Sequence, residues 1–231
     1  MMMGILTGMN YYPPIFVALL AILLPIYLRA ERLSGFKKAT RLKLILSGLC
    51  AICALLGFLT GDISDISRLL VVIALVFAIF GDYYLQYIRL DAKKFILGIS
   101  AFGITQIFLI ISLILRTGFS LFGIALAAIF SLSILLLMIK QKWKLGKERW
   151  PLTCYTMLLS YMTSKAILAL VGDTITVNAI LMAAGGTLFL TSDFFLGIWN
   201  YHTDKRLHLN LCWITYFCAI MFIALSNGSF G

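Results

Sequence analysis

Long runs of apolar residues alternate with short polar segments along the whole chain. Each run is close to the ~20 residues that an α-helix needs to cross the hydrocarbon core of a bilayer. The runs are continuously apolar, whereas the strands of a membrane β-barrel alternate in polarity. The pattern predicts an all-α membrane protein with eight transmembrane helices, at residues 12–28, 42–59, 69–88, 95–115, 119–139, 150–171, 176–199 and 209–226.

The composition favours the same class. Hydrophobic residues make up 62% of the chain and charged residues 12%, against about 25% charged in an ordinary soluble domain. The eight predicted helices use most of the 231 residues, so we expect one integral membrane domain over residues 1–231. No basic segment precedes the first apolar run, which argues against a cleaved signal peptide.

The basic residues are sorted between alternate loops. Arg68 and Arg116 fall in the other set of loops, and Lys165 falls inside a helix. The positive-inside rule then places the basic loops in the cytoplasm and both termini on the non-cytoplasmic side, in a bacterial inner membrane or the endoplasmic reticulum. The net charge of +10 is therefore a topology signal, and we expect no nucleic-acid partner. The basic loops hold Arg29, Arg32, Lys37, Lys38, Arg41 and Lys43; Arg89, Lys93 and Lys94; Lys140, Lys142, Lys144, Lys147 and Arg149; and Lys205 and Arg206.

Two aspartates, Asp82 and Asp193, lie inside apolar runs with similar neighbours, 111 residues apart. The first is in Phe-Gly-Asp-Tyr-Tyr-Leu and the second in Thr-Ser-Asp-Phe-Phe-Leu. A carboxylate at membrane depth costs at least a few kcal/mol, so such residues usually mark a functional site. The alternative is a structural hydrogen bond to a neighbouring helix.

The matching neighbourhoods predict an internal repeat of two four-helix halves, residues 1–115 and 116–231. Because each half has an even number of helices, the halves would be parallel, related by an axis along the membrane normal. The two aspartates would then share a depth near the cytoplasmic boundary and face one site. Paired carboxylates titrate as a coupled unit and suit general acid–base chemistry through oxocarbenium-like states.

No metal site or cofactor is expected. Cys50 and Cys53 have the spacing of a metal or redox motif but lie mid-helix without a second pair, so we interpret them as packing residues. Both histidines, His202 and His208, fall in the last loop, which argues against a zinc hydrolase with ligands inside the membrane.

The chain resembles the YhhN-like lysoplasmalogenase family of multi-pass membrane hydrolases over nearly its whole length. The resemblance rests on Phe80-Gly81-Asp82 with Leu85, on Phe95-x-x-Gly98-x-x-x-Phe102, and on Phe189-Leu190-x-Ser192-Asp193. Tyr155 and the pair Thr215-Tyr216 also fit. One position departs from the pattern: the fourth helix of the family carries a histidine, and Gln106, which cannot transfer protons, stands there.

The resemblance implies hydrolysis of the vinyl ether bond of a lysoplasmalogen, giving a fatty aldehyde and a glycerophospho-headgroup. The substrate would be a lysophospholipid within the bilayer, surrounded by membrane lipids. Asp82 and Asp193 would be the catalytic acid and base, with no metal. The expected substrate-binding residues are Tyr83, Tyr84, Tyr155, Lys165, Gln106, Ser192, Asn200 and Tyr216.

Three alternatives stay open at this level. Lys165 either extends toward the outer interface, pairs with a carboxylate or binds a lipid phosphate. Parallel repeats with acidic residues in the membrane also describe a proton-coupled lipid or small-solute transporter. Two intramembrane aspartates are also compatible with an intramembrane protease, although the surrounding motifs do not match that class.

Overall fold

The computed structural model describes residues 12–33, 36–88, 90–143, 145–171 and 175–228. In these residues the chain forms eight α-helices and one short 3-10 helix, with no strand, which confirms the all-α fold class. The elements are α2 (Tyr12–Leu33), α3 (Phe36–Thr60), α4 (Ile66–Leu85), α5 (Ala92–Thr117), α6 (Leu121–Lys140), η2 (Gly146–Glu148), α7 (Arg149–Leu168), α8 (Val177–Tyr201) and α9 (Arg206–Leu225).

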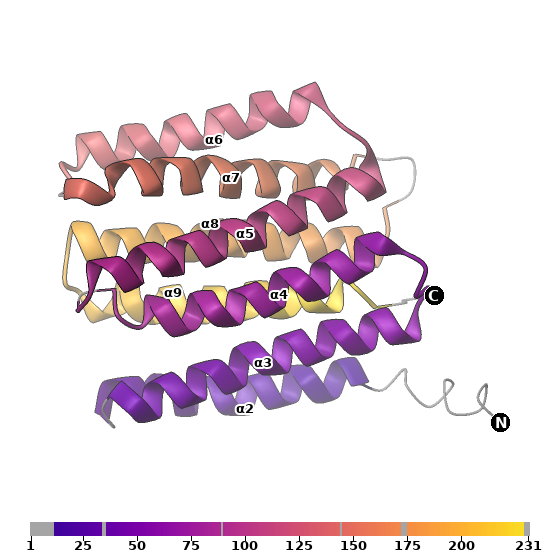
Figure 1. Cartoon of the computed structure of the whole chain (residues 1–231), viewed down its shortest axis with the longest axis horizontal. Coiled ribbons are helices and arrows are strands. Elements are labelled where there is room, and N and C mark those ends of the chain that lie inside the picture. Colours follow the sequence, from indigo (N-terminus) through magenta and orange to yellow (C-terminus); the bar gives the residue numbers. More distant parts are fainter. Residues whose placement is uncertain (1–11, 34–35, 89, 144, 172–174, 229–231) are drawn as a thin grey trace.

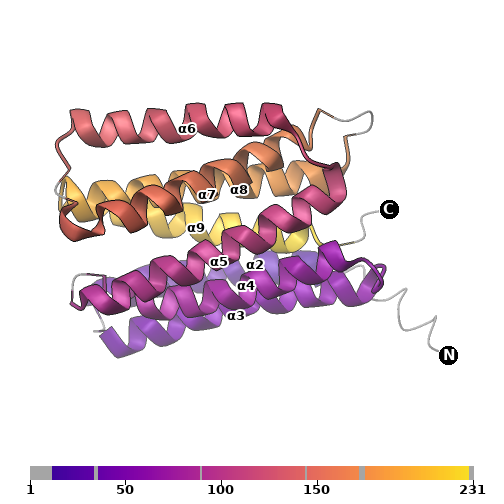
Figure 2. The same cartoon turned by 45° about the horizontal axis from the view of Figure 1, so that its top comes forward.

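The eight helices lie side by side with successive helices antiparallel (Figures 1 and 2). The closest neighbours are α4 with α5 and α8 with α9. Helix α3 packs against α4 and α9, and α5 packs against α7. Helices α2 and α6 lie at opposite edges, on α3 and α7 respectively (Figure 1). The middle of the bundle is therefore built from α3, α4, α5, α7, α8 and α9.

Within the described residues, seven helices are long and apolar enough to cross a membrane by length and composition: all of the α-helices except α7. Helix α7 is of similar length, with 20 residues, but its inward face is polar. Its Thr163 hydroxyl donates to the Gly186 carbonyl at 3.1 Å, and Ser160 and Ser164 are also buried. The low hydropathy of α7 follows from this polar face, which packs against other helices instead of lipid.

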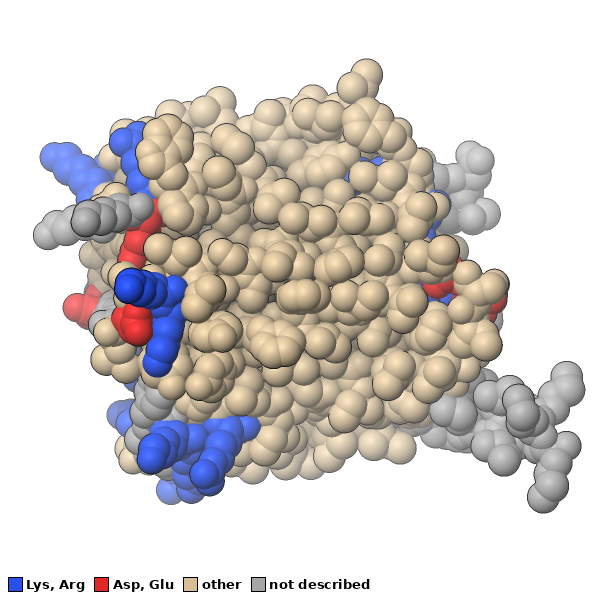
Figure 3. Space-filling model, in the orientation of Figure 1, with Lys and Arg blue, Asp and Glu red and all other residues tan. Residues whose placement is uncertain are grey.

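The surface matches this arrangement. On the face shown in Figure 3, uncharged side chains cover the length of the helices, and Lys and Arg gather at one end of the molecule. At this end lie the connections between α2 and α3, α4 and α5, α6 and α7, and α8 and α9 (Figure 1). These are the four connections in which the sequence places most of its basic residues.

Helix boundaries differ from the apolar runs in a systematic way. Helix α3 begins at Phe36, six residues before the predicted start at 42, so Lys37, Lys38 and Arg41 are helical. An apolar run marks the part of a helix at lipid depth, whereas lysine and arginine favour the helix almost as well as leucine does. Lys43, grouped above with the loop charges although it falls inside the predicted helix 42–59, lies within α3 and is completely buried.

Two glycines bring α4 and α5 close together beside the first aspartate. A Cβ atom at Gly98 would lie 3.0 Å from the backbone nitrogen of Leu85, and one at Gly81 would lie 2.7 Å from the Phe102 ring. A larger residue at either position would push the helices or the ring apart. Glycine at position 81 therefore leaves room for the Phe102 ring. This ring lines the cavity of the candidate active site.

Candidate active site

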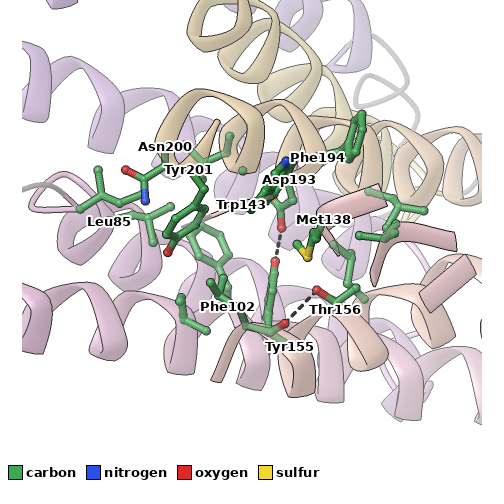
Figure 4. A pocket seen from close by; sticks show the side chains of 18 of the residues that line it. Leu85, Phe102, Met138, Trp143, Tyr155, Thr156, Asp193, Phe194, Asn200 and Tyr201 are labelled. Atoms are coloured by element: carbon green, nitrogen blue, oxygen red, sulfur yellow. Dashed lines mark hydrogen bonds between the residues drawn. The ribbon is translucent and has the colours of Figure 1, made fainter. Parts of the chain in front are cut away.

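Residues of α5, α6, α7 and α8 line a mainly apolar cavity, whose side chains are drawn in Figure 4. Its volume is about 70 Å³. Small apolar ligand sites usually combine such walls with a few convergent polar groups, and the polar groups here are Tyr155, Thr156, Asp193, Asn200 and Tyr201. The apolar walls include Leu85, Ile88, Phe95, Ile99, Phe102, Ile134, Met138, Leu152, Leu159, Leu190 and Phe194.

The carboxyl group of Asp193 is the acidic group of this cavity. The Tyr155 phenol points at it across the cavity from α7 and donates a short hydrogen bond to its Oδ2 atom (Figure 4). Its Oδ1 atom lies 3.3 Å from the hydroxyl of Ser192, which also donates to the Phe189 carbonyl at 2.7 Å. Asp193 is thus held by two hydroxyl groups inside an otherwise apolar wall.

Gln106 of α5 lies next to this pair. It is completely buried and is a neighbour of the Tyr155 hydroxyl. Its amide contributes a weak hydrogen-bond interaction to the Tyr155 hydroxyl, but neither amide atom has a partner at full hydrogen-bond geometry within the described residues. A buried amide without a well-formed hydrogen bond costs about 1–3 kcal/mol, and Gln106 is not among the residues that line the cavity.

Asp82 belongs to a second polar group and is not among the residues that line the cavity. Lys43 of α3 places its Nζ atom 3.1 Å from Oδ1 of Asp82, with 0% and 1% of the two side chains exposed. The hydroxyl groups of Ser47 and Tyr216 both donate to Oδ2, the latter at 2.6 Å. The Lys43 ammonium also lies 4.0 Å from the centre of the Trp213 ring, within the range of a cation–π contact.

Three aromatic rings pack together beside the two acidic groups. Phe102, Phe189 and Tyr216 pack edge to face, with ring centres 5.6 to 5.9 Å apart. Phe102 lines the cavity, and Tyr216 binds Asp82. The charges of Asp82 and Lys43 still act on Asp193. The structure therefore brings the aspartates into neighbouring groups, but only Asp193 among them lines the cavity.

The other expected site residues are divided between the cavity and the rest of the bundle. Asn200 lines the cavity. Tyr83 is 41% exposed on the lipid side of α4 and packs on Tyr84 and Tyr87. Lys165 lies at the opposite end, where its ammonium donates to the Gly118 carbonyl at 2.6 Å. It therefore binds the end of α5 and neither of the two aspartates.

Comparison of the sequence with models of protein families identifies the family of the chain. A sequence model of the YhhN family matches residues 39–227. The chain belongs to the YhhN family. This family includes lysoplasmalogenases, and the match spans the cavity and both acidic groups. Searches of curated proteins and of solved structures gave no significant match.

Within this YhhN protein, the structure adds residues that sequence reasoning missed. Lys43 and Ser47 lie one turn apart on α3, and both contact Asp82. Their spacing with Thr40 places three polar residues on one face of a helix, and all three are buried. The spacing of these three residues could have been recognised in the sequence. It was missed because Lys43 was grouped with the charges of the preceding loop.

Proposed function

We propose that this YhhN protein hydrolyses the vinyl ether bond of lysoplasmalogens, releasing a fatty aldehyde and a glycerophospho-headgroup. The observation that carries the proposal is the hydrogen-bonded pair of Asp193 and Tyr155 in the apolar cavity. A vinyl ether is activated by protonation at carbon, and an aspartic acid in an apolar wall is suited to deliver that proton. Membership in a family that includes lysoplasmalogenases supports the same reaction.

The first step would transfer a proton from Asp193 to the carbon of the vinyl group that lies farther from the ether oxygen. The electron pair of the double bond forms the new C–H bond, and the adjacent carbon and oxygen become an oxocarbenium ion. The resulting Asp193 carboxylate lies opposite this cation and stabilises it. The Tyr155 hydroxyl keeps the carboxyl group in one orientation by its hydrogen bond to Oδ2.

The second step would add water to the oxocarbenium carbon. We propose that the Gln106 amide, which has no partner at full hydrogen-bond geometry among the described residues, binds this water and orients it. Asp193 accepts a proton as the C–O bond forms, and the product is a hemiacetal. Proton transfer from the hemiacetal hydroxyl to the ether oxygen then breaks the C–O bond to the headgroup. Overall, one vinyl ether and one water give one aldehyde and one alcohol.

Asp82 would support this chemistry from the neighbouring group. Its ion pair with Lys43 and its hydrogen bond from Tyr216 fix the Tyr216 ring, and that ring packs against Phe102 of the cavity wall. We therefore propose different roles within the aspartate pair. Asp193 exchanges protons with the substrate, and Asp82 positions the aromatic wall and adds a fixed charge near the reacting carbon.

We further propose that the two halves of the chain are a parallel repeat. Each aspartate receives a hydrogen bond from the helix that precedes its own: from Ser47 of α3 to Asp82, and from Tyr155 of α7 to Asp193. The packing of α3 on α9 corresponds to that of α5 on α7 under the same operation. The proposal also keeps the orientation expected from the loop charges, with both termini on the non-cytoplasmic side.

The test is a product assay with the purified full-length protein. The substrates are lysoplasmalogen and a lysolipid of the same chain and headgroup with a saturated ether bond. We expect fatty aldehyde from the vinyl ether alone, because only a vinyl ether forms an oxocarbenium ion by protonation at carbon. Absence of aldehyde from both substrates would reject the hydrolase and favour the carrier interpretation.

A further inference from the structure

A second, polar cavity lies at the end of the bundle opposite the basic loops. Its volume is about 330 Å³, and it lies between the ends of α4, α5, α7 and α8. Two arginines, Arg68 and Arg116, face it. Most of the other basic residues of the chain lie at the far end (Figure 3). The remaining lining residues are Asp65, Leu113, Thr117, Ala169, Thr176, Asn178, Ala179 and Met182.

The Arg116 guanidinium is held in a fixed orientation. Its Nε atom donates to the Ser67 hydroxyl at 2.9 Å, and one terminal nitrogen donates to the Asn227 side-chain oxygen at 3.1 Å. The Asn227 amide is itself fixed, because it donates to the carbonyls of Ala54 and Arg68 at 3.0 and 3.1 Å. Two hydrogen bonds use two of the five guanidinium donors, so the group keeps further donors for a ligand.

The surroundings of the arginines also favour a negative ligand. Helices α4 and α8 begin at this cavity, at the capping residues Asp65 and Thr176, and helix N-termini carry partial positive charge. Of the described residues that line the cavity, Asp65 is the one that carries a carboxylate. It lies 3.6 Å from the Nε atom of Arg68 and accepts from the backbone nitrogen of Ser67.

An acceptor completes the cavity. The side-chain nitrogen of Asn178 donates to the Gly228 carbonyl at 2.9 Å. Its side-chain oxygen is buried and has no partner among the described residues. An oxyanion that also carries a hydroxyl group would satisfy both the arginines and this oxygen.

We infer that this cavity binds a phosphate group, either that of a lipid headgroup in the facing leaflet or that of a free phosphate compound. Arg68 and Arg116 supply the charge-assisted hydrogen bonds, since the guanidinium fork matches the geometry of phosphate oxygens. Asn178 accepts from a hydroxyl group of the ligand. The site is separate from the cavity of Asp193, at the other end of the helices.

The test uses the purified full-length protein and inorganic phosphate as the first probe. Binding is measured by calorimetric titration at constant ionic strength, with sodium chloride as the reference salt. For the lipid source, the protein is placed in neutral phosphatidylcholine nanodiscs with or without phosphatidylglycerol, and retained lipid is measured by mass spectrometry. The variants are Arg68→Gln and Arg116→Gln, with Lys205→Gln at the opposite end as the control.

Charge-assisted hydrogen bonds contribute about 1.5–3 kcal/mol, so Arg68→Gln should weaken binding at least about tenfold. Lys205→Gln should bind as the wild type does. Saturable binding of inorganic phosphate that depends on Arg68 assigns the site to free phosphate. Retention of phosphatidylglycerol alone, again dependent on Arg68, assigns it to a lipid headgroup.

Arg116 joins α5 to Ser67 and Asn227, so the Arg116→Gln protein can fail to fold. In that case Arg68→Gln alone tests the inference. The inference is overturned if neither probe distinguishes the wild type from Arg68→Gln. It is equally overturned if Lys205→Gln weakens binding as much as Arg68→Gln does, since the charge effect would then be general.

Discussion

The ammonium of Lys43 lies 3.1 Å from the carboxylate of Asp82, between α3 and α4, and both side chains are buried. Two opposite charges in a low-dielectric interior stabilise each other, whereas either charge alone would be costly there. The pair therefore fixes α3 against α4 at the position of the first acidic motif. It also fixes the Tyr216 hydroxyl, which binds the same carboxylate.

Lys43→Met leaves the Asp82 carboxylate without its cation. Removing one partner of a buried ion pair costs about 3–5 kcal/mol, so we expect a clearly lower midpoint of thermal unfolding in detergent. Lys38→Met, on the exposed side of the same helix, is the matched control and should unfold with the wild type. Equal midpoints for Lys43→Met and Lys38→Met would show that the pair does not contribute to stability.

Tyr155→Phe removes the hydroxyl that binds Asp193 and keeps the ring in the cavity wall. A hydrogen bond to a charged group is worth about 1.5–3 kcal/mol, so kcat for aldehyde release should fall about 10- to 100-fold. Tyr161→Phe is the control on the same helix, because the Tyr161 hydroxyl has no partner within the described residues. A Tyr155→Phe protein with the turnover of Tyr161→Phe would remove Tyr155 from the mechanism.

Gly98→Ala should destabilise the contact between α4 and α5. The added methyl group would meet the Leu85 side chain at 2.9 Å and its backbone nitrogen at 3.0 Å, and overpacking of this kind costs about 1–3 kcal/mol. Gly103→Ala on the same helix has its nearest neighbour at 3.9 Å and should be neutral or slightly stabilising, because alanine favours the helix. The midpoints of thermal unfolding of the two variants are compared. Equal midpoints would show that α4 and α5 can move apart to accommodate the methyl group at position 98 without loss of stability.

The orientation in the membrane is tested at the connection between α6 and α7. From the positive-inside rule we expect this connection in the cytoplasm, so Lys142→Cys in a protein without other accessible cysteines should react with a membrane-impermeant reagent only after cell lysis. Asp62→Cys, in the connection between α3 and α4, should react in intact cells. The reverse pattern of labelling would invert the proposed topology.

The sequence was sufficient for the helical architecture because a 20-residue apolar run has few alternatives to a membrane helix. The run at residues 150–171 also predicted the helix α7, although α7 is not among the seven described helices that are apolar enough to span a membrane. The position of Asp82 in a buried ion pair could not be predicted. The ion pair depends on which face of α3 packs against α4. In the sequence, Lys43 follows several charged residues of the preceding loop and resembles them.

The site could be predicted only in part for a related reason. Sequence symmetry suggested that Asp82 and Asp193 face one cavity, and this stays a prediction: Asp193 lines the cavity, Asp82 does not, and the charge of Asp82 acts on Asp193. Phe102 of the cavity wall packs against Tyr216, which binds Asp82. Gly81 and Gly98 were noted as motif residues, and their packing against Phe102 and Leu85 became visible only in three dimensions.

The central claim is that Asp193 is the proton donor for vinyl ether hydrolysis. The most direct measurement compares aldehyde release from lysoplasmalogen by the wild type and by Asp193→Asn, with thermal unfolding as the check that the variant is folded. Asparagine keeps the size and polarity of the side chain but has no proton to donate, so turnover should fall at least about 100-fold. A folded Asp193→Asn protein that releases aldehyde at the rate of the wild type would contradict the account.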